Sequence, residues 1–120
     1  MIYTCGIVED EPLAEKMLRK YIDRVSFLEL VWTCTYAKEA VDLMQQQQAD
    51  MLFLDLQEVP ITPNSSFLYL INHYDHVIVT SPYPMEAIGI ELSPLAFLNK
   101  PIAFEHFLDA IERFLASLGS

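Results

Sequence analysis

Apolar runs alternate with amphipathic segments along this chain, and this alternation limits its fold more than any other feature. Five short runs are apolar at consecutive positions, as in strands buried on both faces, and they cover 2–8, 28–35, 51–54, 76–80 and 95–98. Each is followed by a segment with helical spacing of apolar residues, and these cover 12–25, 37–47, 66–73, 84–91 and 103–117. Strands of this kind, separated by helices, predict a parallel sheet covered on both sides.

Right-handed crossovers between parallel strands leave few arrangements of such a sheet. The leading one is a flavodoxin-like, doubly wound α/β sandwich of five βα units, with a five-stranded parallel sheet in the order 2-1-3-4-5. The chain has 120 residues, of which 52% are hydrophobic and only 3 are glycine, so it can fill one core. We therefore expect a single domain over 1–120.

The acidic balance of the chain excludes several classes of function. Seven Lys and Arg against 17 Asp and Glu give a net charge of −10, which opposes binding of this domain to nucleic acid or to an anionic membrane surface. No apolar stretch approaches the roughly 20 residues of a membrane-spanning helix, and no signal peptide is visible. With Cys5 and Cys34 interpreted as reduced thiols, these features predict a cytoplasmic protein.

The positive charge is concentrated in one predicted helix. Four of the seven basic residues lie at helical spacing within 12–25, namely Lys16, Arg19, Lys20 and Arg24. Such a group is either a solvated helix face or a docking edge for an acidic partner, and the sequence leaves both interpretations open.

Polar residues gather where the predicted strands end. They are Glu9 and Asp10 after the first run, Asp55 after the third, Thr80 and Ser81 at the end of the fourth, and Lys100 after the fifth. Lys100 is the only Lys or Arg between Lys38 and Arg113. Because parallel sheets bind ligands beyond the carboxyl ends of their strands, we expect a pocket of carboxylates with one fixed cation there. Such a pocket suits a divalent metal ion and a phosphoryl group.

Three segments carry a resemblance to a known family. They are Ile7-Val8-Glu9-Asp10-Glu11-Pro12-Leu13-Ala14, Phe53-Leu54-Asp55-Leu56-Gln57 and Phe97-Leu98-Asn99-Lys100-Pro101-Ile102. In this order and at these separations they resemble the CheY-like receiver domain of two-component response regulators, over nearly all of 1–117. Within that family the chain looks most like the LytTR (LytR/AlgR) type.

The resemblance implies a phosphorylation site. Asp55 would be the phosphoacceptor, taking a phosphoryl group from a histidine kinase or a small phosphodonor. Mg²⁺ would be held by Asp10, Asp55 and the backbone carbonyl of Gln57, with Glu9 acting directly or through water. Lys100 would pair with Asp55 before the reaction and with the phosphoryl oxygens after it. Beyond self-phosphorylation and autodephosphorylation, no enzymatic activity is expected.

The resemblance also implies a switch. A hydroxyl that senses the phosphoryl group comes from either Thr80 or Ser81, and the spacing to Lys100 favours Ser81 as the contacting and switch residue. Phe97 matches the position of an aromatic residue that turns inward when the hydroxyl moves. The output would be a changed surface, with possible homodimerisation through the helix at 84–91, the strand at 95–98 and the helix at 103–117. Transcriptional regulation would require a DNA-binding domain that these 120 residues do not include.

Several residues depart from the family pattern. Glu58 and Val59 replace the usual Met-Pro after the phosphoacceptor, the usual loop glycine is replaced around Pro63, and Pro82 stands where a small residue is common. They motivate an alternative function, a degenerate receiver that acts as a phosphorylation-independent interaction module. A Mg²⁺-dependent phosphohydrolase is disfavoured, because that class needs a second Asp where this chain has Gln57.

Overall fold

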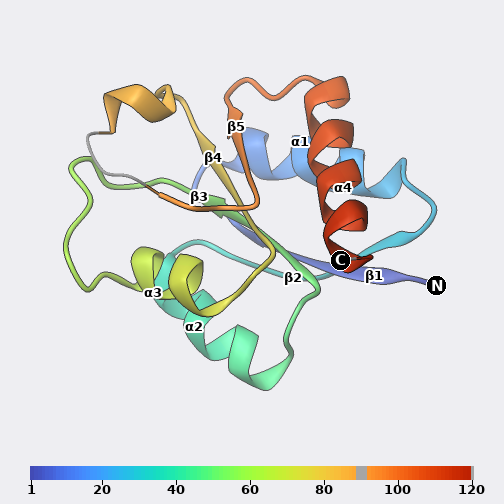
Figure 1. Cartoon of the computed structure of the whole chain (residues 1–120), viewed down its shortest axis with the longest axis horizontal. Helices are drawn as coiled ribbons and strands as arrows, with labels where there is room; N and C mark the ends of the chain where they lie inside the picture. The colour runs from blue at the N-terminus through green and yellow to red at the C-terminus, as the bar shows by residue number, and fades with distance from the viewer. Residues whose placement is uncertain (89–91, 120) are drawn as a thin grey trace.

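The protein is built around one five-stranded parallel sheet (Figure 1). The structure, a computed structural model, describes residues 1–88 and 92–119. The strands are β1 (Tyr3–Val8), β2 (Leu28–Cys34), β3 (Met51–Asp55), β4 (Val77–Ser81) and β5 (Ala96–Asn99). They lie in the order β2-β1-β3-β4-β5, which confirms the flavodoxin-like topology expected from the alternation of apolar runs and helical segments.

Helices cover both faces of the sheet (Figure 1). They are α1 (Pro12–Asp23), α2 (Ala37–Gln46), α3 (Ser66–His73) and α4 (Phe104–Leu118). Buried residues of α1 and α4 form one core cluster with the sheet, and buried residues of α2 and α3 form a second cluster on the other face. Proline at the first helical position starts α1, as the sequence predicts, because its missing N–H is not needed there.

The alternation of side chains along β3 divides the core between the two faces. Met51 and Phe53 belong to the cluster under α1 and α4, whereas Leu52 and Leu54 belong to the cluster under α2 and α3. The same alternation continues to Asp55, so Asp55 lies on the same face of β3 as Phe53. A strand that is buried on both faces thus ends in a carboxylate of defined orientation.

The helix expected over 84–91 is the main departure from the predicted elements. Within the described residues this segment contains only a short 3-10 turn, η1 (Met85–Ala87), and positions 89–91 lie outside them. Pro82 and Pro84 have no backbone N–H to donate, so helical hydrogen bonding begins only beyond them. The proposed dimerisation surface is therefore described here only at its β5 and α4 parts.

Leu13 is an exposed apolar residue of α1. It shares the helical spacing of the apolar residues within 12–25, yet it is 75% exposed. It lies in the first turn of α1 and lines a hollow with Lys100 and Pro101, at the level where the strands end. The sheet does not extend far enough to cover it.

Gly6 in β1 is required by the packing of one aromatic ring. A Cβ atom at this position would lie 2.6 Å from the side chain of Trp32, which is closer than real contacts allow. The ring is held in place because its indole N–H donates to the carbonyl of Gln47 at 2.9 Å. We expect Gly6→Ala to lower the free energy of unfolding by about 1–3 kcal/mol, as overpacked cores do. Urea denaturation measures this, and Gly119→Ala is the control because its Cβ would lie 3.8 Å from the nearest atom. Equal stability of the two variants would contradict the packing argument.

Candidate functional site

One lysine joins two buried carboxylates at the carboxyl edge of the sheet. Lys100 follows β5, and its Nζ lies 2.6 Å from Oε1 of Glu9 and 2.9 Å from Oδ1 of Asp55. Glu9 follows β1 and is 5% exposed, and Asp55 ends β3 and is 4% exposed. Segments far apart in sequence therefore converge as predicted, with one ammonium group between two acids.

Backbone hydrogen bonds hold these residues in position. The amide of Lys100 donates to the carbonyl of Ser81 at 2.8 Å, which ties the start of its loop to β4. The amide of Glu9 donates to the carbonyl of Cys34 at 3.0 Å, which ties it to β2. The Glu9 carboxylate also accepts from the amide of Glu11 at 3.1 Å. The ion pairs thus rest on fixed backbone rather than on flexible loops.

A third carboxylate completes an acidic cluster. Glu9, Asp10 and Asp55 each offer an oxygen, and these oxygens lie within 4.8 Å of one another. Asp10 is exposed, whereas Glu9 and Asp55 are buried, and Lys100 already occupies one oxygen of Glu9. Hard carboxylate oxygens in this number fit Mg²⁺, which is usually bound through one or two carboxylates while it keeps several waters. Asp10 and Asp55 are the two acids best placed to supply them.

Burial changes the proton affinity of the site. Loss of solvent around Asp55 raises the pKa of its carboxyl to about 7; the hydrogen bond from Lys100 opposes this rise and the charge of Glu9 adds to it. Burial by itself would lower the pKa of Lys100, but hydrogen bonds to Glu9 and Asp55 outweigh it, so the pKa is raised. The lysine therefore stays charged, while Asp55 without a metal ion beside it holds its proton unusually well.

The strand register bears on the choice between the two candidate hydroxyls. Asp55 pairs with Thr80 across β3 and β4, and Thr80 pairs with Leu98 across β4 and β5. Residues paired in neighbouring strands point to the same face, so Thr80 shares the face of Asp55, and Ser81 points to the other. The Ser81 hydroxyl accepts instead from the amide of Tyr83 at 2.9 Å. The register thus favours Thr80, whereas spacing to Lys100 favours Ser81, and the contacting hydroxyl stays a prediction.

Phe97 lies on the face opposite to Thr80. It pairs with Val79 and is half-buried against the cluster under α2 and α3. A conformational change of its ring on phosphorylation stays a prediction.

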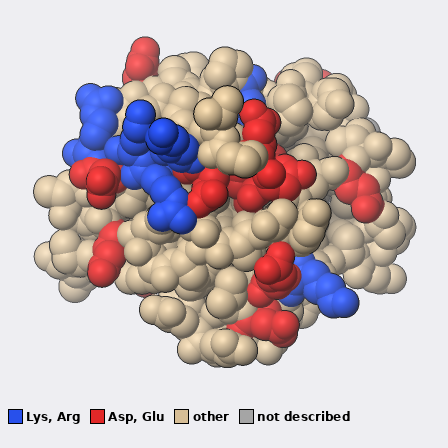
Figure 2. All heavy atoms as spheres, turned by 180° about the vertical axis from the view of Figure 1, so that it is seen from behind, with Lys and Arg blue, Asp and Glu red and all other residues tan. Residues whose placement is uncertain are grey.

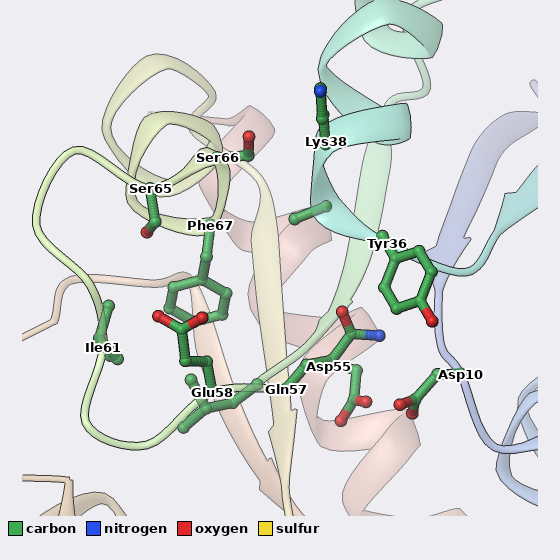
Figure 3. Close-up of a pocket in the computed structure, with 12 residues that line it drawn as sticks. Asp10, Tyr36, Lys38, Asp55, Gln57, Glu58, Ile61, Ser65, Ser66 and Phe67 are labelled. Atoms are coloured by element: carbon green, nitrogen blue, oxygen red, sulfur yellow. The ribbon is translucent and has the colours of Figure 1, made fainter.

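Glu58, the charge predicted to disturb the site, is bound within its own loop. Its Oε1 accepts from the amide of Thr62 at 3.0 Å and from the hydroxyl of the same residue. In Figure 3 the Glu58 side chain is directed away from Asp55. The loop also needs a left-handed residue, which Asn64 supplies with φ of 60° close to the position where the family glycine is replaced.

A hollow of about 360 Å³ opens beside Asp55 (Figure 3). It is lined by Asp10, Asp55, Gln57 and Glu58 on one side. On the other side it is lined by Lys38 of α2 and Phe67 of α3, with Tyr36 and Ile61 from the loops that precede these helices. The side-chain amide of Gln57 donates to the carbonyl of Thr35 at 2.6 Å, which joins the loop after β3 to the loop after β2. Tyr36, which the sequence did not single out, stands at the rim with its ring toward Asp10 (Figure 3).

The surface around the site is mixed in charge. Figure 2 shows a dense group of basic side chains next to an acidic area. Lys16, Arg19 and Lys20 of α1 line one hollow of about 470 Å³, and Arg19 is paired with Glu15 at 2.7 Å. The predicted concentration of positive charge on this helix is confirmed, whereas its partner stays open.

The raised pKa of Asp55 predicts an unusual dependence of stability on pH. The pKa of Asp55 rises from 3.8 to about 7 on folding, so ionisation is less favourable in the folded protein than in the unfolded chain. The free energy of unfolding therefore falls as pH rises from about 4 to 7. Without metal, Asp55→Asn should be more stable than the wild type at pH 8 by about 1–4 kcal/mol. The difference should shrink towards pH 4 and in saturating Mg²⁺. Urea titrations across this range measure it, and a difference that does not change with pH would contradict the prediction.

Comparisons with known proteins agree with this geometry. No family model matches the chain. It is 31% identical over 102 residues to the transcriptional regulatory protein BtsR of Escherichia coli K12, covering 80% of this chain and 41% of that protein. The chain thus spans less than half the length of this relative.

Among the solved structures that match nearly the whole chain are two response regulator domains. The REC domain of AraT, a response regulator from Geobacillus stearothermophilus, has a TM-score of 0.74 and 24% identity, over 99% of this chain and 97% of that one. The response regulatory domain of mrkE from Klebsiella pneumoniae has a TM-score of 0.75 and 21% identity, over 95% and 96%. Within the described residues, no helix is long and apolar enough to cross a membrane. With strand-end acids and Lys100 arranged as the family motif requires, the chain belongs to the CheY-like receiver domains of response regulators.

Proposed function

We propose that this domain is a phosphoacceptor switch, phosphorylated on Asp55 in a Mg²⁺-dependent reaction. The observation that carries the proposal is the Lys100 ammonium group within 2.9 Å of Asp55, beside the acidic cluster of Glu9, Asp10 and Asp55. An anionic donor needs a cation to approach three carboxylates, and Lys100 supplies one on a fixed backbone.

The chemistry follows from the positions of these groups. Ionised Asp55 attacks phosphorus, the bond from phosphorus to the donor's nitrogen or oxygen breaks, and the leaving group takes the electron pair. Asp10, Asp55 and the Gln57 carbonyl would hold Mg²⁺, with Glu9 acting directly or through water, and the ion would supply positive charge to the phosphoryl oxygens. Lys100 then exchanges its contact with Asp55 for one with a phosphoryl oxygen. No separate base is needed once Mg²⁺ and Lys100 favour the ionised form of the attacking carboxylate.

The switch would use the hydroxyl on the same face. Thr80 pairs with Asp55 across the strands, so it is the residue we propose to contact the phosphoryl group. Movement of Thr80 would favour one of two packings of the β4–β5 region, including Phe97 and the surface of β5 and α4. A phosphoryl group shifts that balance only by its different affinity for the two packings.

The wider role rests on the relatives. A histidine kinase is the proposed phosphodonor, and transcription is the proposed output, since BtsR is named a transcriptional regulatory protein. With a charge of −10, this domain itself is not the nucleic-acid-binding part. Homodimerisation through β5 and α4, membership of the LytTR type and the lack of further enzymatic activity stay predictions from the sequence.

A second function, a phosphorylation-independent interaction module, is favoured by specific departures. Glu58 and Val59 replace the family's Met-Pro, Pro63 and Pro82 alter the neighbouring loops, and the segment after Pro84 contains little helix among its described residues. In that case the site would keep its ion pairs for stability alone.

Phosphorylation distinguishes the two functions. Incubation with Mg²⁺ and acetyl phosphate should add the mass of one phosphoryl group, and beryllofluoride should change the oligomeric state. Asp55→Asn is the matched control and should show neither effect, because an amide cannot form the acyl phosphate. Intact mass and size-exclusion chromatography measure the two outcomes. No adduct and no shift at millimolar Mg²⁺ would favour the interaction module.

The choice of hydroxyl has its own test. Thr80→Ala should weaken beryllofluoride binding about fivefold or more, because one hydrogen bond is worth about 1 kcal/mol and more to a charged group. Ser81→Ala should leave that affinity unchanged, since its hydroxyl bonds to the amide of Tyr83 on the other face. Fluorine NMR titrations compare the two variants, and the reverse result would return the role to Ser81.

A further inference from the structure

We propose that Tyr21 is a positioning residue for Lys100, acting through a hydrogen bond from its phenolic hydroxyl to the loop that carries the lysine. The inference deepens the proposed function, since Lys100 is the cation of the phosphorylation site. Among the described residues, no hydrogen bond joins Tyr21 to the acids of that site, so its proposed effect on them passes through Lys100.

The contact joins two parts of the chain that are 81 residues apart. The Tyr21 hydroxyl donates to the backbone carbonyl of Ile102 at 2.7 Å, in a partly buried position. Ile102 lies two residues after Lys100, in the segment between β5 and α4 that belongs to neither strand nor helix. A side chain of α1 therefore supplies a hydrogen bond that regular structure does not give this segment.

The loop is held on both sides of the lysine. Before the side chain, the amide of Lys100 donates to the carbonyl of Ser81 at 2.8 Å. After it, Tyr21 holds Ile102. Between these two anchors Nζ reaches Glu9 at 2.6 Å and Asp55 at 2.9 Å. Release of the second anchor would let the backbone of Lys100 shift, and with it the ammonium group.

The ring of Tyr21 is itself fixed. It packs against Phe104 with ring centroids 5.1 Å apart and against Phe107 at 5.4 Å. Phe107 stacks on Phe53 at 5.5 Å, and Phe53 lies two residues before Asp55 on the same face of β3. The guanidinium of Arg24 covers Phe104 at 3.8 Å from its centroid. One aromatic cluster thus supports both the strand of the nucleophile and the loop of the cation.

A purely structural interpretation has to be separated from this one. A buried tyrosine hydroxyl often satisfies a nearby carbonyl and adds about 1 kcal/mol to stability without any effect on a site. The two interpretations differ in what Tyr21→Phe changes. A structural hydroxyl changes only the free energy of unfolding, whereas a positioning hydroxyl also changes the contacts of the Lys100 ammonium group.

Tyr3→Phe is the matched control. Tyr3 packs on the same core cluster, with Phe114 at 5.1 Å and Phe27 at 6.5 Å, and among the described residues its hydroxyl makes no hydrogen bond. It lies at the start of β1, at the opposite end of the sheet from Lys100. The same atom is removed from the same kind of ring, far from the loop.

Nitrogen-detected NMR of lysine ammonium groups tests the proposal on the metal-free protein. The Lys100 signal, assigned by its absence in Lys100→Met, should exchange slowly with water in the wild type because it is held by two carboxylates. Tyr21→Phe should speed this exchange about fivefold or more, the loss expected from one hydrogen bond. Tyr3→Phe should leave it unchanged, and an unchanged signal in both variants would overturn the proposal.

Ligand binding supplies a second measurement. Tyr21→Phe should weaken beryllofluoride binding in saturating Mg²⁺ by a similar factor while Mg²⁺ affinity is retained, because the metal ligands do not include Lys100. Equal losses of both affinities would indicate general destabilisation and count against a positioning role. If the wild type binds no beryllofluoride, the proposed function fails, and the ammonium exchange still decides the role of Tyr21.

Discussion

The bridge from Lys100 to Glu9 and Asp55 is the interaction on which the rest of the site depends. Two carboxylates buried at the end of a parallel sheet would repel each other strongly without a cation between them. The ammonium group at 2.6 and 2.9 Å resolves that conflict and links the carboxyl ends of β1, β3 and β5. The site is therefore both a weak point of the fold and the place where an incoming cation or anion has the largest effect.

The packing of helices on both faces of the sheet explains how the site residues keep their orientation. Because β3 is buried on both faces, a slip by one residue would exchange Phe53 and Leu54 between clusters of different shape. The packing of large side chains thus fixes the direction of Asp55, although none of them touches the reacting groups. Tyr21 extends the same principle to the loop after β5, where a hydrogen bond to Ile102 replaces strand pairing.

Much of this could be predicted from the sequence, for identifiable reasons. Strands that are apolar on both faces and alternate with helices allow few topologies, and strand-end polar residues then share one edge. The sequence alone leaves the choice between Thr80 and Ser81 open, because it depends on which residue of β4 faces Asp55, and spacing along the chain does not give the strand register. Leu13 shows a similar limit: helical periodicity gives a direction around the axis, but not which turn of the helix is covered. The Tyr21 hydrogen bond joins residues 81 apart and has no local signal at all.

The hollow beside Asp55 would limit the lifetime of the proposed phosphorylated state. At about 360 Å³, and bordered by exposed Asp10, it is wide enough for water to reach the carboxylate that would carry the phosphoryl group. An acyl phosphate at that position would lie open to hydrolysis from the same side through which the donor arrives. Such an acyl phosphate would hydrolyse without a separate phosphatase. The access of water through this opening, which has Tyr36 at its rim, would set the rate of hydrolysis.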